Sequence, residues 1–151
     1  MYARRALPAS LVAIVVLAAA CSSSTPSVSG PPSPSVSRPS GVQTQASDGG
    51  QVTVVVDWAG PATGAVFDVT LDTHSVDLDA LELRDAVLRN DRGETLGARP
   101  WAAPKGGHHR RGTLTFDGDG APFLAGARWI ELVVRGVGDL PERTLRWEVG
   151  S

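Results

Sequence analysis

The sequence predicts an all-β fold, an antiparallel β-sandwich of immunoglobulin-like shape with about seven strands, which follows a disordered linker. Apolar and polar residues alternate with period two in short stretches, as expected of strands with one buried face. Glycine and proline separate these stretches, and no stretch keeps a helical period. The predicted organisation is a signal peptide over residues 1–20, a cysteine and linker over 21–50, and the sandwich over 51–151.

The first twenty residues have the order of a secretory signal. Arg4 and Arg5 precede an apolar segment that ends in small residues at 18–20. The uncharged run over residues 6–20 is shorter than the roughly 20 residues that cross a bilayer, so a permanent transmembrane helix is the weaker interpretation. We expect this segment to export the chain and to be removed.

The segment Leu17-Ala18-Ala19-Ala20-Cys21 resembles the lipobox of bacterial lipoproteins, although Ala18 stands where that pattern prefers leucine. The resemblance implies that Cys21 is lipidated, becomes the new amino terminus and anchors the chain to a lipid bilayer on the extracytoplasmic side. A diacylated cysteine is a lasting anchor because each buried methylene contributes about 0.8 kcal/mol. A secreted protein without an anchor is the alternative. Cys21 is the only cysteine, so the domain forms no internal disulfide.

The segment from Ser22 to Gly50 predicts a disordered spacer. It is rich in serine, proline and glycine, has no aromatic residue, and carries only two charges, on Arg38 and Asp48. Such a composition cannot bury enough surface to offset the entropy lost on ordering.

The alternating stretches after the linker are the expected strands, with a bend near Arg84 in the third and a turn over 90–93 before the fourth. They cover residues 51–58, 67–72, 81–88, 94–96, 113–116, 129–135 and 144–149. At most one helical turn is expected, within 76–83. Trp58 and Trp147 fall in phase with the apolar residues and are expected in the core.

The charge of the exported part argues against a nucleic-acid partner. All 16 acidic residues follow Cys21, whereas Arg4 and Arg5 precede it and leave 12 of the 14 basic residues, for a net charge of −4. A negative domain also has no electrostatic attraction for anionic lipid.

Three histidines, His74, His108 and His109, are the candidate metal ligands. Three neutral imidazoles suit zinc or copper, and three protein ligands with one open position is a known catalytic zinc geometry. Two features oppose a site: neighbours in a strand point to opposite faces, and Arg110 and Arg111 add positive charge beside it. A hydrogen-bonded pair of loop histidines without a cofactor is therefore the simpler interpretation.

Two acidic pairs are weaker candidates. Asp117 and Asp119 are similar to part of a calcium loop, but the twelfth position is Arg128 rather than glutamate. Asp77 and Asp79 share a face if the backbone is extended, and a solvated edge is their simpler interpretation.

The sequence lacks the G-x-S-x-G, phosphate-loop and H-E-x-x-H motifs. Ser75 adjoins His74, but neighbouring side chains on extended backbone diverge and do not make a nucleophile and its base. We therefore expect a domain that is not an enzyme.

Five short stretches together resemble those of small exported bacterial β-domains without a known activity, over residues 51–149. They are residues 73–78, Trp101, 106–110, 112–116 and 143–147. The resemblance implies that His74 and the loop of His108 and His109 belong to one feature, and it implies no activity.

The first functional hypothesis is a membrane-anchored extracytoplasmic lipoprotein whose β-sandwich is a binding or interaction domain. Trp101 lies in the long loop over 97–111, and its simpler interpretation is an anchor that packs this loop onto a sheet. With Arg110 and Arg111 it is otherwise the candidate surface for an envelope protein partner. Trp129, which is out of phase, is another candidate for the surface. Two alternatives stay open: a zinc or copper carrier or metal-dependent enzyme that uses the three histidines, and a structural cell-envelope protein.

Overall fold

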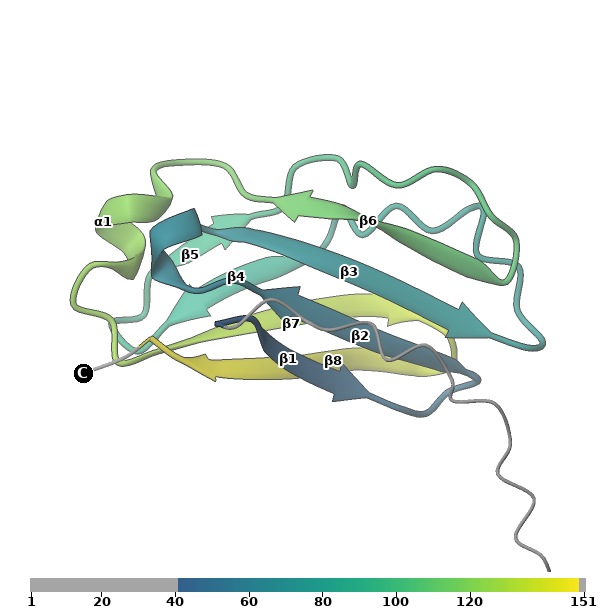
Figure 1. Cartoon of the computed structure of the whole chain (residues 1–151). Coiled ribbons are helices and arrows are strands. Elements are labelled where there is room, and N and C mark those ends of the chain that lie inside the picture. Colours follow the sequence, from purple (N-terminus) through teal and green to yellow (C-terminus); the bar gives the residue numbers. More distant parts are fainter. Residues whose placement is uncertain (1–40, 150–151) are drawn as a thin grey trace, which may run out of the picture. The chain divides into compact units, whose positions relative to one another are not determined.

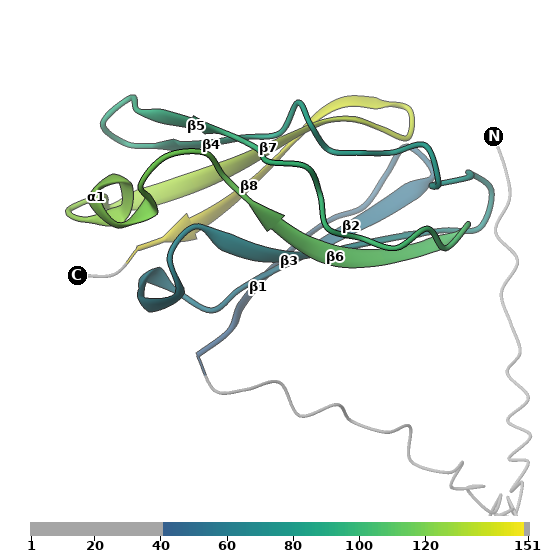
Figure 2. The ribbon, with the colours of Figure 1, turned by 90° about the horizontal axis from the view of Figure 1, so that it is seen from above.

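A computed structural model describes residues 41–149, which form two antiparallel four-stranded sheets packed face to face (Figures 1 and 2). The first sheet has the order β1-β2-β3-β6 and the second β5-β4-β7-β8. The strands are β1 (Gln43–Ser47), β2 (Val52–Trp58), β3 (Val66–Thr73), β4 (Val87–Asn90), β5 (Thr95–Gly97), β6 (His109–Thr115), β7 (Trp129–Val137) and β8 (Leu140–Glu148). The predicted all-β antiparallel sandwich is confirmed, with eight strands rather than about seven.

The path of the chain through the first sheet differs from that of an immunoglobulin constant domain. There the order ABED places strand E beside strand B, although E comes later in the chain. Here β3 lies beside β2 and follows it directly, as a hairpin. The second sheet has the order of immunoglobulin strands C′CFG. This domain and an immunoglobulin domain are thus both sandwiches of two antiparallel sheets, but the chain connects the strands of the first sheet in a different order.

Alternation along the strands produces the core between the sheets. The inward residues of β2 are all at most 2% exposed, and those of β3, β4, β7 and β8 lie against them. They include Val54, Val56, Trp58, Phe67, Val69, Leu71, Leu88, Ile130, Leu132 and Trp147. Each such side chain contributes about 1.5–3 kcal/mol when it leaves water, so this layer supplies most of the stabilisation of the fold.

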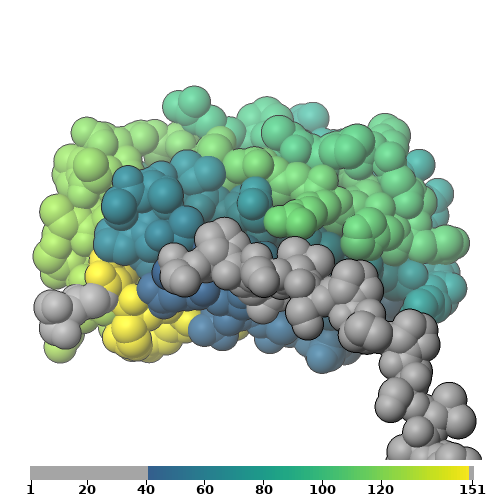
Figure 3. Space-filling view, viewed as in Figure 1, coloured from purple at the N-terminus to yellow at the C-terminus, as the bar shows by residue number. Residues whose placement is uncertain are grey.

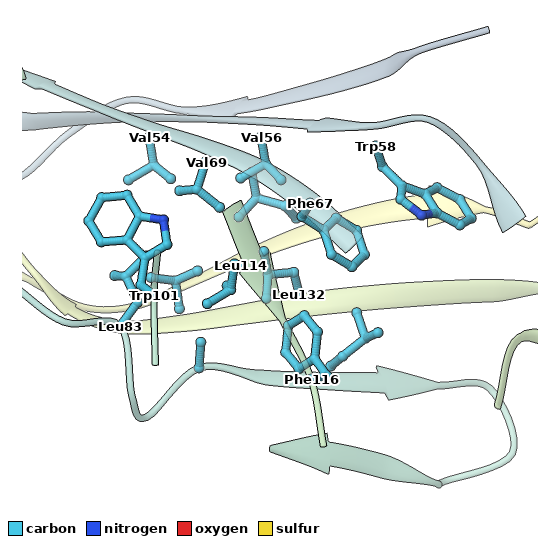
Figure 4. Close-up of a cluster of buried hydrophobic side chains, with 14 of the residues drawn as sticks. Val54, Val56, Trp58, Phe67, Val69, Leu83, Trp101, Leu114, Phe116 and Leu132 are labelled. Atoms are coloured by element: carbon cyan, nitrogen blue, oxygen red, sulfur yellow. The ribbon is translucent and has the colours of Figure 1, made fainter. Parts of the chain in front are cut away.

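Aromatic rings gather in one half of the core. Phe67 lies 5.9 Å from Trp58, 5.3 Å from Trp147 and 5.8 Å from Phe116 between ring centroids. The core positions predicted for Trp58 and Trp147 are therefore confirmed. Figure 4 shows Trp58 and Phe67 on one side of the cluster and Trp101 on the other.

The folded domain begins before residue 51, because β1 lies inside the segment predicted as linker. The prediction of a linker that runs to residue 50 is therefore wrong at its end. Hydrogen bonds rather than apolar side chains hold β1: its five residues pair with β2, Trp147 Nε1 donates to the Gln43 carbonyl at 3.1 Å, and Arg143 donates to the Ser47 carbonyl at 2.9 Å. No apolar period marks such a strand. Residues 1–40, with the predicted signal, Cys21 and most of the linker, lie outside the described residues.

The segment over 74–86 has no strand or helix, so the expected strand over 81–88 is limited to β4. Within 76–83 a single turn forms, in which the Leu81 amide donates to the Leu78 carbonyl at 3.0 Å. Leu78 and Leu83 are nevertheless buried, and the backbone of Leu83 has a positive φ of 46°. The change of phase near Arg84 is therefore not a bend in a strand. It arises because an irregular loop packs its leucine side chains onto the core. The predicted turn after Asn90 is confirmed by the hydrogen bond from the Gly93 amide to its carbonyl at 3.1 Å.

The loop before β6 is shorter than expected, because β6 begins at His109. Part of this loop lies along β6, with isolated bridges from Ala98 to Phe116 and from Ala102 to Thr113. Two short helical elements, η1 (Pro61–Thr63) and α1 (Gly120–Leu124), were not expected. The Asp119 side chain accepts from the Ala121 amide at the start of α1, so it is a helix cap rather than part of a calcium loop.

The described chain enters and leaves the sandwich at one end, and the segments that contain the histidines lie at the other. Gln43, where the chain enters the domain, pairs with the end of β2 at Trp58, and the last described residue, Val149, follows β8 at this same end (Figure 1). The start of β2 lies at the other end, beside Thr73. We call this other end the histidine end; it comprises residues 47–52, 73–79, 104–109 and 137–140. Figure 3 shows the outer face of the first sheet between the two ends.

Candidate functional site

An open hollow of about 300 Å³ lies at the histidine end. All three histidines of the chain face it, from the segment after β3 and from the start of β6. Its lining residues are Gln51, Thr53, Asp72, Thr73, His74, His108 and His109. The expectation that His74 and the His108–His109 loop form one feature therefore agrees with the geometry.

The register of the first sheet brings His109 to Asp72. Thr53 of β2 pairs with Asp72 of β3, which pairs with His109 of β6, so the three residues form one row on the outer face. Directly opposite side chains of antiparallel strands lie about 4.5–5.5 Å apart at Cβ. The Nδ1 atom of His109 contacts the Asp72 carboxylate, which can only accept a hydrogen bond from it. Nδ1 is thus the protonated nitrogen, and the lone pair of the neutral ring lies on Nε2.

His108 has the same protonation pattern from a different partner. Its Nδ1 atom lies 2.9 Å from the carbonyl oxygen of Val76, which accepts the hydrogen bond. The His108 carbonyl accepts from the Thr73 amide at 3.0 Å, which continues the pairing of β3 and β6 by one residue. The ring turns toward the loop after β3, so adjacent histidines reach one hollow although strand alternation alone would separate them.

A carboxylate holds the loop that precedes His108. Asp79 Oδ1 accepts from the Gly106 amide at 2.8 Å and the Gly107 amide at 3.0 Å. The hydrogen bonds from Gly107 and then Gly106 lower the pKa of Asp79 below its ordinary value of 3.8. Asp77 accepts from the Asp79 amide at 2.9 Å. The two carboxylates are therefore part of the support of the loop and not a free pair.

Two glycines are required in this loop. Gly107 has a positive φ of 61°, a conformation that glycine adopts without strain. A Cβ atom on Gly106 would lie 2.3 Å from the carbonyl oxygen of His109, which is too close for any other residue. The chain at His108 and His109 is consequently fixed from both sides.

Arg110, which follows His109 in β6, is buried and is 2% exposed. Its guanidinium donates to four carbonyl oxygens in the two loops at this end, and it lies 4.7 Å from the centre of the Trp101 ring. The acceptors are Leu78 at 2.8 Å, Leu81 at 2.5 Å, Pro104 at 3.0 Å and Ala103 at 3.1 Å. Its charge is therefore directed away from the hollow.

The predicted interaction surface does not form, because Trp101 is only 4% exposed and Arg110 is buried with it. Trp101 packs into the core and its Nε1 atom has no hydrogen-bond partner among residues 41–149. Of the predicted three residues only Arg111 is at the surface, 3.7 Å from Asp68. Trp129 is half-buried on the outer face of the second sheet, beneath Arg146.

Gln51 is a lining residue that the sequence analysis missed. Its backbone has a positive φ of 66°, which is uncommon outside glycine. Its side chain donates to Asp139 at 2.6 Å and accepts from Ser75 at 2.8 Å, while its carbonyl accepts from the Thr73 hydroxyl at 2.6 Å. These bonds join the β7–β8 hairpin to the loop after β3. Asp72 was also missed, although its position two residues before His74 places both on one face of a strand.

The geometry limits the chemistry of the hollow. Within residues 41–149, no group of three or more histidine, cysteine, aspartate or glutamate side chains is arranged to hold a metal ion, so the predicted three-histidine centre does not form. Asp72 holds the imidazole of His109 in one orientation, as the third group of a catalytic triad holds its general base. The nearby Ser75 hydroxyl donates to Gln51 instead, so it is not an activated nucleophile. The hollow presents fixed polar groups.

No protein-family model, no curated protein and no solved structure matches this chain. The resemblance to small exported β-domains stays a prediction. Across residues 41–149, the helices are too short and too polar to cross a bilayer.

Proposed function

We propose that the chain is an extracytoplasmic lipoprotein, anchored through Cys21, whose β-sandwich is a binding module that uses the histidine end. One observation carries the proposal: the hollow lies at the end of the sandwich opposite Gln43, where the amino-terminal part of the chain enters. A domain attached at Gln43 presents the hollow away from its attachment point. The lipobox-like sequence before Cys21 supplies the attachment.

The spacing between anchor and domain fits this arrangement. Residues 22–42 separate Cys21 from β1. A flexible chain of this length averages about 25 Å from end to end. That distance holds the sandwich clear of the lipid surface and leaves its far end open to a ligand or to another envelope protein.

The hollow favours recognition over catalysis. Its volume of about 300 Å³ is at the lower limit of small-ligand sites. The imidazoles of His108 and His109 and the side chain of Gln51 are each held by hydrogen bonds, so they meet a ligand with little loss of side-chain entropy. We therefore assign the hollow to a small polar ligand or to a polar segment of a partner.

Anchoring is tested by the substitution Cys21→Ser, with Ser22→Ala as the matched control. Cells are fed an alkyne fatty acid and the membrane fraction is examined. Wild type and Ser22→Ala should carry the label and sediment with membranes, and Cys21→Ser should do neither. Equal labelling of Cys21→Ser and wild type would refute the anchor.

Use of the histidine end is tested by photo-crosslinking in intact cells. A photoreactive amino acid replaces Ser75, at the rim of the hollow, or Ala121, on α1 at the opposite end; both positions are exposed. The proposal expects a discrete adduct from position 75 that is absent from position 121. Adducts from position 121 alone, or identical adducts from both, would contradict it.

A further inference from the structure

We propose that the hollow binds an organic ammonium group, that is, a protonated amine on a small molecule or on a lysine side chain. The inference rests on the proposed function, because it names the ligand class of the same hollow, but it does not depend on the lipid anchor. The juxtaposition that carries it is a hollow whose fixed polar groups accept hydrogen bonds, in a part of the domain with several exposed carboxylates.

The two imidazoles that are held by hydrogen bonds present acceptors to a ligand. A neutral imidazole has one N–H, and its other nitrogen can only accept. The N–H of His109 is on the nitrogen that contacts Asp72, and the N–H of His108 is donated to the Val76 carbonyl at 2.9 Å. Each Nε2 atom can therefore accept from a donor of its own, and the two atoms need not converge on one point.

The other lining side chains add acceptors and few free donors. The Thr73 hydroxyl uses its only hydrogen in the bond to the Gln51 carbonyl at 2.6 Å. The side-chain amide of Gln51 donates to Asp139 at 2.6 Å, which occupies one of its two N–H groups. The Asp72 carboxylate only accepts, and it has a second oxygen besides the one that His109 contacts. A ligand that supplies N–H donors therefore matches this lining better than one that supplies acceptors.

The charges near the hollow favour a cation. Asp72 lines the hollow, Asp139 accepts from its Gln51, and Asp77 is exposed on the loop after β3. Among the described residues of the histidine end, Lys105 is the only exposed lysine or arginine. A concave site with one sign of charge raises the local concentration of a ligand with the opposite charge.

The nearby arginines are directed elsewhere. Arg110 and Arg143 are 2% and 3% exposed, and their guanidinium groups donate to backbone carbonyls. Arg111 lies on the outer face of the first sheet, 3.7 Å from Asp68. The carboxylates at the hollow therefore keep an excess of negative charge toward solvent.

An ammonium group fits this lining better than a neutral alcohol or an anion. Hydrogen bonds from an ionised donor are roughly twice as strong as those from a neutral one. An ammonium group has three N–H donors and no acceptor, so it places no lone pair against Nε2 of His108 or His109. An anion would place acceptors against acceptors and would be repelled by Asp72.

The acceptors are held in place before a ligand arrives. Asp79 fixes the loop before His108 through the amides of Gly106 and Gly107, at 2.8 and 3.0 Å. The His108 carbonyl also accepts from the Thr73 amide at 3.0 Å. Groups that are already ordered lose little conformational entropy on binding, so an open hollow can still hold a small ligand.

The test is an NMR titration of the mature chain in micelles of a non-ionic detergent, at about pH 8, where a primary amine is protonated. Four probes of similar size are compared: n-propylamine, 1-propanol, propanoate and n-propyltrimethylammonium. The last keeps the positive charge but has no N–H donor. Propylamine should bind at least about tenfold more tightly than each of the other three. It should also shift the nitrogen-15 signals of Nε2 in His108 and His109, as a donor to those atoms does, whereas propyltrimethylammonium should not.

Substitutions separate the acceptors of the hollow from a general effect of charge. Asp72→Asn should weaken propylamine binding at least about tenfold, because the carboxylate becomes a neutral amide. His108→Phe keeps a ring but removes Nε2, and it should weaken binding about 3–10-fold, the equivalent of one hydrogen bond. The matched control is Asp68→Asn, on the same outer face of β3 and beside Arg111, which should bind as wild type does. Circular dichroism melts establish that each variant is folded at the temperature of the titration.

Two peptides identify the source of the ammonium group. One is a capped glycine peptide with a single lysine, and the other has acetyl-lysine, which is neutral, at that position. If the lysine peptide binds at least as tightly as propylamine and the acetylated peptide does not bind, the hollow takes a lysine side chain of a protein partner. If propylamine binds and neither peptide does, the ligand is a free small amine. Both results support the proposal.

The proposal is overturned if the folded wild-type chain binds propylamine no more tightly than 1-propanol or propanoate. It is also overturned if propyltrimethylammonium binds as tightly as propylamine, or if Asp68→Asn weakens binding as much as Asp72→Asn. A discrete crosslinked adduct from position 75, in a chain that shows no preference for the amine, would refute this inference alone. Amine binding by a chain that is not labelled at Cys21 would refute the proposed function instead.

Discussion

Removal of the Arg110 guanidinium should destabilise the whole histidine end. The side chain is 2% exposed and its hydrogen bonds reach carbonyls in both loops, at Leu78, Leu81, Ala103 and Pro104. Arg110→Ala leaves these buried acceptors without their donor and removes the contact with the Trp101 ring.

The size of the effect follows from those contacts. Hydrogen bonds from charged donors contribute about 1.5–3 kcal/mol each, but they are not additive within one network. A buried carbonyl oxygen that is left without a donor costs about 1–3 kcal/mol. We expect Arg110→Ala to lower the free energy of unfolding by about 3–5 kcal/mol, a large part of the total of about 5–15 kcal/mol for a small domain. Arg110→Lys should lose less, about 1.5–3 kcal/mol, because an ammonium keeps the charge and some of the bonds.

The assay is urea unfolding followed by tryptophan fluorescence, since Trp58, Trp101 and Trp147 are all buried. The matched control is Arg111→Ala, at the adjacent position. The Arg111 side chain is 60% exposed and has one carboxylate 3.7 Å away, so its loss should cost less than about 1 kcal/mol. Equal effects of Arg110→Ala and Arg111→Ala, or a loss below about 1 kcal/mol for Arg110→Ala, would refute the role of the buried guanidinium.

Three other substitutions test the core, the loop and the carboxylate that holds it. Leu132→Ala, in the centre of β7, should cost about 2–5 kcal/mol in the same urea assay because the site is fully buried; a loss below 1 kcal/mol would contradict the packing. Gly106→Ala should lower the melting temperature, since the new Cβ would lie 2.3 Å from the His109 carbonyl oxygen; an unchanged melt would show that the loop is not fixed. The lowered pKa of Asp79 makes its stabilisation complete above the ordinary value of 3.8, and this stabilisation is lost as pH falls through the lower folded pKa. Wild type should therefore lose stability more steeply than Asp79→Asn as the pH falls below about 4. If the free energies of unfolding of the two proteins fall in parallel with pH, the Asp79 carboxylate does not stabilise the fold.

The sequence was most informative where side chains alternate between core and solvent. Val54 and Val56 in β2 follow period two without interruption, and the predicted strand is confirmed. β1 escaped notice because its inward side carries glutamine and serine, so that backbone pairing and donors from Arg143 and Trp147 hold it instead. Hydrogen bonds of this kind leave no apolar signal in a sequence.

The candidate site was only partly predictable, for a similar reason. Three histidines in two glycine-containing segments indicated one feature, and the hollow contains all three. The sequence allowed Trp101 either to anchor the loop onto a sheet or to form a surface with Arg110 and Arg111, and the structure agrees with the anchor. Four carbonyls that converge from two loops provide the site that buries Arg110, and that convergence depends on tertiary structure.

The position of Gln43 determines how the domain responds to mechanical force. If the anchor pulls at Gln43 while a bound partner pulls at the histidine end, the tension runs along β1 and not across it. The five residue pairs between β1 and β2 are then loaded together in shear, with the donors from Trp147 and Arg143 at the two ends of the strand. A tether joined at Ser47 would instead peel the pairs apart one at a time. Under a pull of this kind, the strand with the weakest sequence signal is the one that transmits the force into the domain.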